Sequence, residues 1–151
     1  MIRVQKHNFS IQDELKILEL RCNNVGAFSS FIGTVRNKRQ KEKLLSMTLE
    51  HYPGMTEIMI QKIENEALRR WDILGTTIIH RYGELFPGDQ IVLVITASKH
   101  RKEAVESCHF IIDWLKTKGP FWKYEKTQNE GFWVEAKKSD IKEELKWQTN
   151  Q

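Results

Sequence analysis

Hydrophobic residues recur at helical spacing in three stretches of the chain. Ser10 fits the N-cap of a first helix that runs to about Arg21. A stronger pattern runs from Met55 to Trp71, and a third runs from about His100 to Thr117, where Gly119-Pro120 ends it because proline cannot continue the hydrogen-bond ladder. The predicted core stripes are Met59, Ile63, Ala67 and Trp71, widened by Ile60 and Leu68, and Ala104, Cys108, Ile111 and Leu115, flanked by Val105 and Ile112.

Between these helices the pattern changes to that of β-strands. Ala27 to Arg36 is rich in β-branched and aromatic residues, and Leu45 to Tyr52 alternates, with Leu45, Met47, Leu49 and His51 on one face. Further strands are predicted at Thr76–His80, at Ile91–Ala97 (apolar enough to be buried on both faces) and at Phe132–Ala136. The basic stretch from Asn37 to Lys43 is predicted to be an exposed hairpin turn. Because hairpin-like strands are mixed with helices, the predicted fold class is α+β.

A length of 151 residues fits one domain, residues 1–151, with its own core. No apolar run approaches the roughly 20 residues of a membrane helix, and Met1 to Ser10 lacks the apolar stretch of a secretory signal, so we expect a cytoplasmic protein. The charged tail from Lys137 to Gln151 is expected to be a frayed helix or disordered. Cys22 and Cys108 are the only cysteines, too few and too far apart for a zinc site.

The net charge of +4 favours anionic partners without identifying them. Basic residues interleaved with Phe121, Trp122, Tyr124 and Trp133 could stack nucleic-acid bases. However, 24 basic residues are nearly matched by 20 acidic ones, and no nucleic-acid motif is present. An RNA-binding domain is therefore the weaker alternative, and a titration of affinity against salt would identify it.

Two groups of residues could carry chemistry. Lys116 lies at the border of the third helix's apolar stripe, so its stem can pack on the core and its amine can be partly desolvated. The break at Gly119-Pro120 could return Lys123 towards it, although lysines on either side of a helix end are more often simply exposed to solvent. The second group is Ser98-Lys99-His100-Arg101, where a buried strand meets a helix N-terminus that suits an anion. A purely structural strand-to-helix junction, with Ser98 as the helix cap, is an equally good interpretation of these residues. Arg36, at a strand end, could hold a phosphate bidentately.

Several separated motifs in this order resemble the large-subunit family of molybdopterin synthase over nearly the whole chain. They are Thr34-Val35-Arg36-Asn37, Leu49-Glu50-His51-Tyr52-Pro53-Gly54-Met55-Thr56-Glu57, His80-Arg81-Tyr82-Gly83-Glu84-Leu85, Pro87-Gly88-Asp89, Ser98-Lys99-His100-Arg101, Leu115-Lys116-Thr117-Lys118, Pro120-Phe121-Trp122-Lys123 and Trp133-Val134-Glu135-Ala136. Lys99 and the basic loop from Lys38 to Lys43 depart from the family pattern, which bears on affinity rather than on the class of reaction.

The resemblance implies a hammerhead-type α+β fold and a homodimer within a heterotetramer. It implies a sulfurtransferase that acts in molybdenum cofactor biosynthesis. Sulfur would pass from the C-terminal Gly-Gly thiocarboxylate of a small ubiquitin-like subunit to cyclic pyranopterin monophosphate, so the chain itself needs no cofactor, metal or reactive cysteine. The family's two key lysines correspond to Lys116 and Lys123, and its anion pocket to Arg36, His100 and Arg101. A non-catalytic binding module that keeps the same scaffold is the other alternative, which intact Lys116 and Lys123 disfavour.

Overall fold

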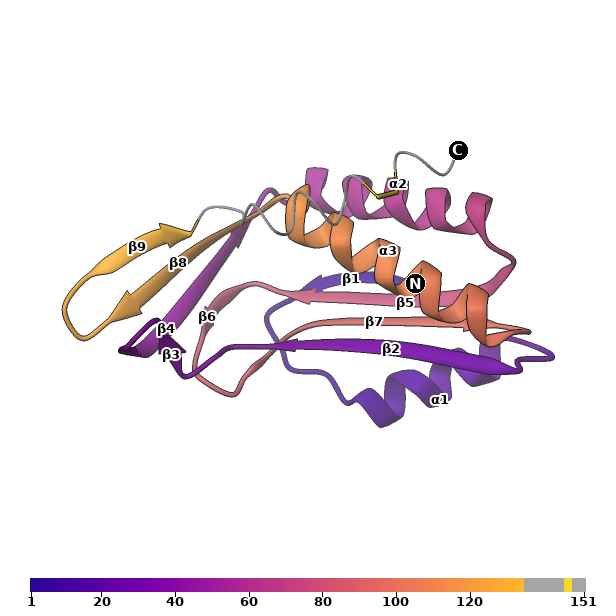
Figure 1. Cartoon of the computed structure of the whole chain (residues 1–151), viewed down its shortest axis with the longest axis horizontal. Helices are drawn as coiled ribbons and strands as arrows, with labels where there is room; N and C mark the ends of the chain where they lie inside the picture. Colours follow the sequence, from indigo (N-terminus) through magenta and orange to yellow (C-terminus); the bar gives the residue numbers. More distant parts are fainter. Residues whose placement is uncertain (135–145, 148–151) are drawn as a thin grey trace.

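The computed structural model describes residues 1–134, 146 and 147. These residues form a mixed α and β structure with two sheets, which confirms the predicted α+β class (Figure 1). In chain order the elements are β1 (Ile2–Gln5), α1 (Ile11–Arg21), β2 (Ala27–Thr34), β3 (Lys38–Arg39), β4 (Glu42–His51), α2 (Met55–Arg70), β5 (Ile73–Arg81), β6 (Gly83–Leu85), β7 (Gln90–Ser98), α3 (Arg101–Thr117), β8 (Phe121–Thr127) and β9 (Gly131–Val134).

The four-stranded sheet has the strand order β1-β5-β7-β2. β1 is parallel to β5, whereas β7 is antiparallel to both of its neighbours. α2 and α3 cover one face of this sheet and α1 covers the other (Figure 1). Because β7 is covered on both sides, Val92 to Ser98 are all buried, as its unbroken apolar pattern predicts.

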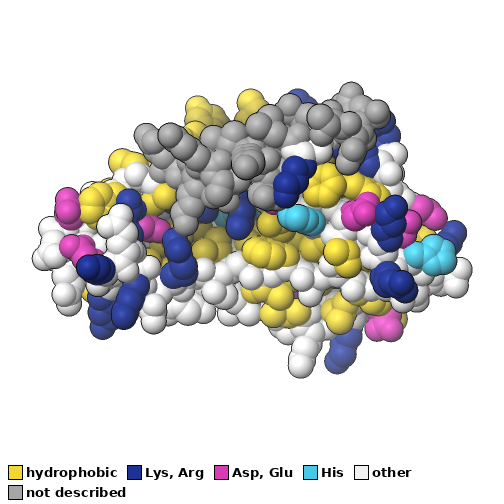
Figure 2. Space-filling view, in the orientation of Figure 1, with side chains coloured by type: hydrophobic (Ala, Val, Ile, Leu, Met, Phe, Trp, Pro, Cys, Tyr) yellow, Lys and Arg dark blue, Asp and Glu magenta, His cyan; other side chains and the backbone are white. Residues whose placement is uncertain are grey.

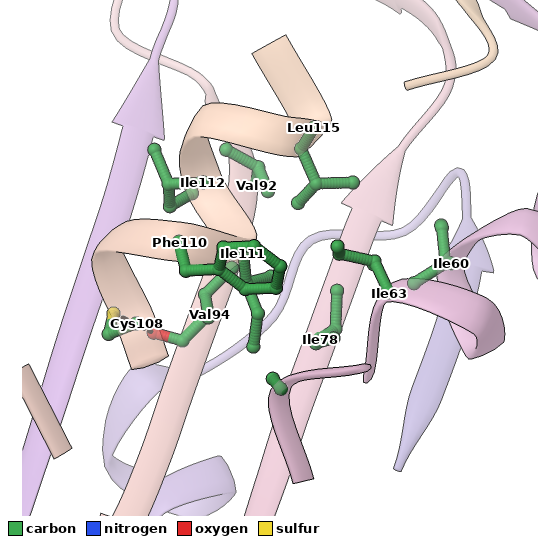
Figure 3. Close-up of a cluster of buried hydrophobic side chains, with 11 residues drawn as sticks. Ile60, Ile63, Ile78, Val92, Val94, Cys108, Phe110, Ile111, Ile112 and Leu115 are labelled. Atoms are coloured by element: carbon green, nitrogen blue, oxygen red, sulfur yellow. Dashed lines mark hydrogen bonds between the residues drawn. The ribbon is translucent and has the colours of Figure 1, made fainter. Parts of the chain in front are cut away.

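The main core lies between the sheet and the two covering helices. Ile60 and Ile63 of α2 meet Ile111 and Leu115 of α3 above Ile78 of β5 (Figure 3). The predicted stripes are correct at their centres, and of the predicted flanking residues Ile60 and Ile112 are buried whereas Leu68 and Val105 are not. Leu68 and Val105 are 44% and 56% exposed, because each lies just beyond the arc of its helix that faces the sheet.

The starts of the helices follow local hydrogen bonding. The Ser10 side chain accepts a hydrogen bond from the Asp13 backbone N–H at 3.3 Å, which confirms the predicted cap of α1. The predicted Ser98 cap of α3 is wrong, because the N-cap position belongs to His100. The Ser98 hydroxyl instead donates to the Asp72 carbonyl at 2.8 Å and so ties the end of β7 to the loop before β5.

The sequence patterns missed or misplaced several strands. β1 was not predicted, because only Ile2 and Val4 show its alternation before the polar residues that follow. β2 ends at Thr34 rather than at Arg36, after a register shift between Gly33 and Thr34. In β4 a similar irregularity buries Leu44 and leaves Leu45 exposed, which reverses the predicted alternation at that end of the strand.

The second sheet has the order β3-β4-β8-β9, with β6 also paired to β4. The basic stretch from Asn37 to Lys43 forms the predicted hairpin turn, in which Lys38 faces Lys43 across β3 and β4. The predicted last strand, Phe132–Ala136, corresponds to β9, and its final residues, like most of the tail from Lys137, lie outside the described residues. Among the described residues, no helix has the length and apolar character needed to cross a membrane.

Candidate active site

A cavity of about 520 Å³ opens where the end of α3 meets both sheets. Its walls come from β2, the first residues of β7, the last turn of α3 and one face of β8. The cationic side chains of Arg36, Lys116 and Lys123 line it together with His80 and Glu125. Its volume is in the range of small-molecule sites, and its cationic lining suits an anionic ligand.

Lys116 reaches the cavity from the last turn of α3. Its Nζ lies 5.8 Å from the centroid of the Phe31 ring on β2, so the ammonium lies over an aromatic wall. Leu115, the residue before it, is buried in the main core. The side chain of Lys116 is exposed in this chain, however, and the predicted partial desolvation of its amine is therefore wrong for the single subunit.

β8 brings Lys123 to the same cavity. The chain leaves α3 through Gly119, where a side chain would clash because an added Cβ would lie 2.2 Å from the Leu115 carbonyl oxygen. It then pairs with β4, so that Lys123 lies opposite Leu49. Because side chains alternate along a strand, Phe121, Lys123 and Glu125 all line the cavity while Trp122 is exposed. The predicted return of Lys123 towards Lys116 is confirmed.

Sequence reasoning missed the ion pair beside these lysines. Arg39, in the basic hairpin, donates to the buried Glu125 carboxylate at 2.8 Å, and its guanidinium lies 4.4 Å from the centroid of the Phe132 ring on β9. The pairing supplies a partner for a carboxylate that is only 5% exposed. No pattern in the sequence links residues 86 positions apart, so only the β4–β8 pairing reveals this contact.

His80 is the second residue that sequence reasoning missed as part of the site. Its ring stacks on Phe121 with centroids 3.6 Å apart and an angle of 13° between the planes. Burial lowers the pKa of His80 to about 3; the hydrogen bond to the Arg81 carbonyl opposes this effect, and the positive charges of Lys123 and His51 add to it. His80 is therefore a neutral imidazole in a cationic cavity at any physiological pH.

His100 and Arg101 lie outside this cavity. Both are exposed at the first turn of α3, whereas Lys116 lies in its last turn. Sixteen residues of helix separate His100 from Lys116, which at about 1.5 Å per residue is about 24 Å. The five predicted site residues therefore do not gather in one hollow of a single chain, because a straight helix keeps its two ends apart.

The described residues also bear on metal binding. Among residues 1–134, 146 and 147, no group of three or more His, Cys, Asp or Glu side chains could hold a metal ion. The groups that line the cavity include two amines, a guanidinium, a neutral imidazole and the Glu125 carboxylate.

Comparisons with known proteins identify the family of this chain. A family model described as MoaE protein matches residues 4–118. The molybdopterin synthase catalytic subunit of Ralstonia nicotianae is 45% identical over 97% of this chain and 83% of its own length, and that of Escherichia coli K12 is 46% identical over 92% of each.

Solved structures show the same relationship. The molybdopterin biosynthesis MoaE protein of Burkholderia ambifaria superposes with a TM-score of 0.85 at 43% identity and 99% coverage of both chains. A molybdopterin synthase from Staphylococcus aureus gives a TM-score of 0.79 at 28% identity over 87% of this chain and 95% of that one. The family match and the near full-length identity leave one assignment: this chain belongs to the MoaE protein family.

Proposed function

We propose that this chain is the catalytic subunit of a molybdopterin synthase. It transfers sulfur from the C-terminal thiocarboxylate of a small ubiquitin-like subunit to cyclic pyranopterin monophosphate, and the product carries the molybdopterin dithiolene. The observation that carries the proposal is the convergence of Lys116 from α3, Lys123 from β8 and Arg36 from the loop after β2 on one cavity. The names of its full-length relatives support the same reaction.

Each lysine has a role that follows from its place. Lys116 is the more exposed of the two and lies in the last turn of α3, where a visiting glycine tail can reach it. It orients the terminal carbonyl of the partner and assists acyl or proton transfer there. Lys123 is half-buried deeper on β8, beside His80, and serves the proton transfers of the substrate. Arg36 holds the cyclic phosphate with its planar guanidinium.

His100 and Arg101 fit the same reaction only in an assembly. The resemblance to the family implies a homodimer, and the length of α3 places these residues about 24 Å from Lys116 of their own chain. We therefore assign them to the cavity of the neighbouring protomer, where their charges would hold the phosphate together with Arg36. The exposure of both side chains in the single chain is consistent with this role.

The proposal also includes a cytoplasmic location. Cys22 and Cys108 are both free thiols in the structure, as expected where thiols are kept reduced.

Cys108 is buried and contacts the Val94 carbonyl, and burial raises its pKa, so it is an unreactive part of the core. The sulfur that is transferred must then come from the partner.

The alternative of RNA binding gains little from the structure. Phe121 is stacked on His80, and Tyr124 packs against Trp133 with ring centroids 5.2 Å apart, so neither is an open platform for a base. On the described part of the face shown in Figure 2, Lys and Arg side chains are scattered among hydrophobic and acidic ones rather than gathered in a stripe. The enclosed cavity favours a small anionic substrate.

One reconstitution tests the proposal. The purified chain is mixed with a thiocarboxylated small subunit and cyclic pyranopterin monophosphate, and the products are identified by mass spectrometry. We expect a dithiolene product and conversion of the partner's thiocarboxylate to a carboxylate. Recovery of unchanged pterin, with a folded chain and an intact thiocarboxylate, would contradict the proposed function.

A further inference from the structure

His80 occupies a position that packing alone would give to an apolar side chain. It follows Ile78 and Ile79 on β5, both fully buried, and lies opposite Val92 of β7 in the register. Only 5% of its surface is exposed, yet it lines the cavity that holds the two lysines. Burying an imidazole costs free energy unless its polar atoms find partners, so both of its nitrogens need an account.

One ring nitrogen of His80 forms a hydrogen bond within its own strand. Nδ1 lies 2.9 Å from the Arg81 carbonyl oxygen, which can only accept, so Nδ1 carries the proton. Because the ring is neutral, Nε2 then carries a lone pair. The tautomer therefore leaves a hydrogen-bond acceptor on a buried ring that borders the cavity.

The groups around that acceptor are mostly cationic. Arg36, Lys116 and Lys123 line the same cavity, and its carboxylate, Glu125, is paired with Arg39. His51 of β4 also lies near Phe121, with ring centroids 6.2 Å apart, and is hydrogen-bonded to the Thr56 hydroxyl. Lys123 is the candidate donor that we favour, because it is two residues from Phe121 on the same face of β8, Phe121 carries the His80 ring, and the charge of Lys123 acts on His80.

We propose that His80 is a positioning residue for Lys123: its neutral Nε2 accepts a hydrogen bond from the Lys123 ammonium and holds that amine, protonated, towards the substrate. The proton stays on Lys123, and His80 does not touch the reacting atoms. The mutual influence of the two groups agrees with this arrangement, since the charge of Lys123 helps to keep His80 neutral. The expected effect of His80 on the rate rests on the proposed function, whereas its expected effect on the titration of Lys123 does not.

Two substitutions of His80 distinguish the roles of its two ring nitrogens. His80→Asn keeps a donor near the Nδ1 position for the Arg81 carbonyl and removes the acceptor, whereas His80→Gln places an amide oxygen near the Nε2 position. We expect the Lys123 ammonium, followed by NMR in lysine-labelled protein and assigned with Lys123→Arg, to titrate at lower pH in His80→Asn. The rate of dithiolene formation should fall about tenfold at mildly alkaline pH, which is the effect of losing one hydrogen bond to a charged group. KM should be unchanged, and the alkaline limb of the plot of rate against pH should move to lower pH.

The remaining variants decide what the loss means. His80→Gln should restore most of the rate and of the Lys123 titration. The matched control, His51→Asn, changes the other histidine near Phe121 and should leave both the rate and the Lys123 titration unchanged. An unaltered Lys123 titration in His80→Asn would overturn the inference, as would equal loss in His80→Asn and His80→Gln. If the wild-type chain makes no dithiolene, the proposed function fails, while the NMR comparison still decides the role of His80.

Discussion

The two ends of α3 carry similar residues in different surroundings. At its start, His100 and Arg101 are exposed on the first turn, beside a surface ion pair between Lys99 and Asp72 at 3.8 Å. At its end, Lys116 borders a cavity closed by β8, which adds Lys123 and stacks Phe121 on the buried His80. The difference teaches that basic residues at a helix end line a cavity where a second element packs beside them, and we infer that the open end is completed by another chain.

The largest expected effect is at the enclosed end. Lys116→Ala and Lys123→Ala should each lower the rate of dithiolene formation by ~10²–10⁴-fold, the range of general acid–base catalysis. Circular dichroism and thermal unfolding should show an unchanged fold, because neither side chain belongs to the main core. Turnover at the wild-type rate in either variant would remove that lysine from the mechanism.

The open end should affect substrate binding, and across the dimer. Arg101→Ala should raise KM by about 10- to 100-fold, since it removes a charge-assisted hydrogen bond to phosphate. Inactive Lys116→Ala and weakened Arg101→Ala chains, unfolded together and refolded, should recover roughly a quarter of wild-type activity, because random pairing gives half of the two-fold dimers one complete cavity. If mixing yields no more activity than the separate variants, each cavity is built from one chain and our assignment is wrong.

The third prediction concerns the pH dependence of stability, which should differ between the buried His80 beside the end of α3 and the exposed His100 at its start. The pKa of His80 is about 3 in the folded chain and near its ordinary 6.5 when unfolded, so the unfolded state binds more protons between these values. Stability is therefore complete above about pH 6.5 and is lost as the pH falls towards 3, by about 2 kcal/mol at pH 5.

Urea unfolding at neutral pH and at pH 5 measures this loss. His80→Gln should lose about 2 kcal/mol less than the wild type over the same interval, and His100→Gln is the control substitution at an exposed histidine. Equal losses in all three proteins would show that His80 is not kept neutral by the fold.

The sequence alone predicted what local pattern encodes. The three helices, the buried strand β7 and the turn after α3 follow from periodicity and from Gly119-Pro120. The resemblance to the family identified Lys116, Lys123 and Arg36. Neither approach found His80 or the Arg39–Glu125 pair, because both depend on β8, whose alternating polar residues resemble an ordinary loop until β4 pairs with it.

The distance between His100 and Lys116 was predictable from the length of the helix, but a list of motifs in sequence order gives no distances. Residues of one site need not share a chain, and a motif list contains no information about which copy supplies each residue. The structure of the single chain therefore separates what the resemblance had placed together.

The smallest expected effect compares the two ends of α3 directly. The backbone dipole disfavours a cation at a helix N-terminus and favours one at a C-terminus. Arg101→Gln should therefore raise the free energy of unfolding by ~0.3–1 kcal/mol, and Lys116→Gln should lower it by a similar amount, since glutamine has nearly the same helix propensity as either residue. Urea unfolding at low ionic strength measures both shifts, and about 1 M salt should remove them by screening. If the two variants shift the free energy of unfolding in the same direction, contacts other than the dipole dominate. If Arg101→Gln raises it and Lys116→Gln lowers it, Arg101 occupies an unfavourable position in the free chain, as expected of a residue that binds an anion.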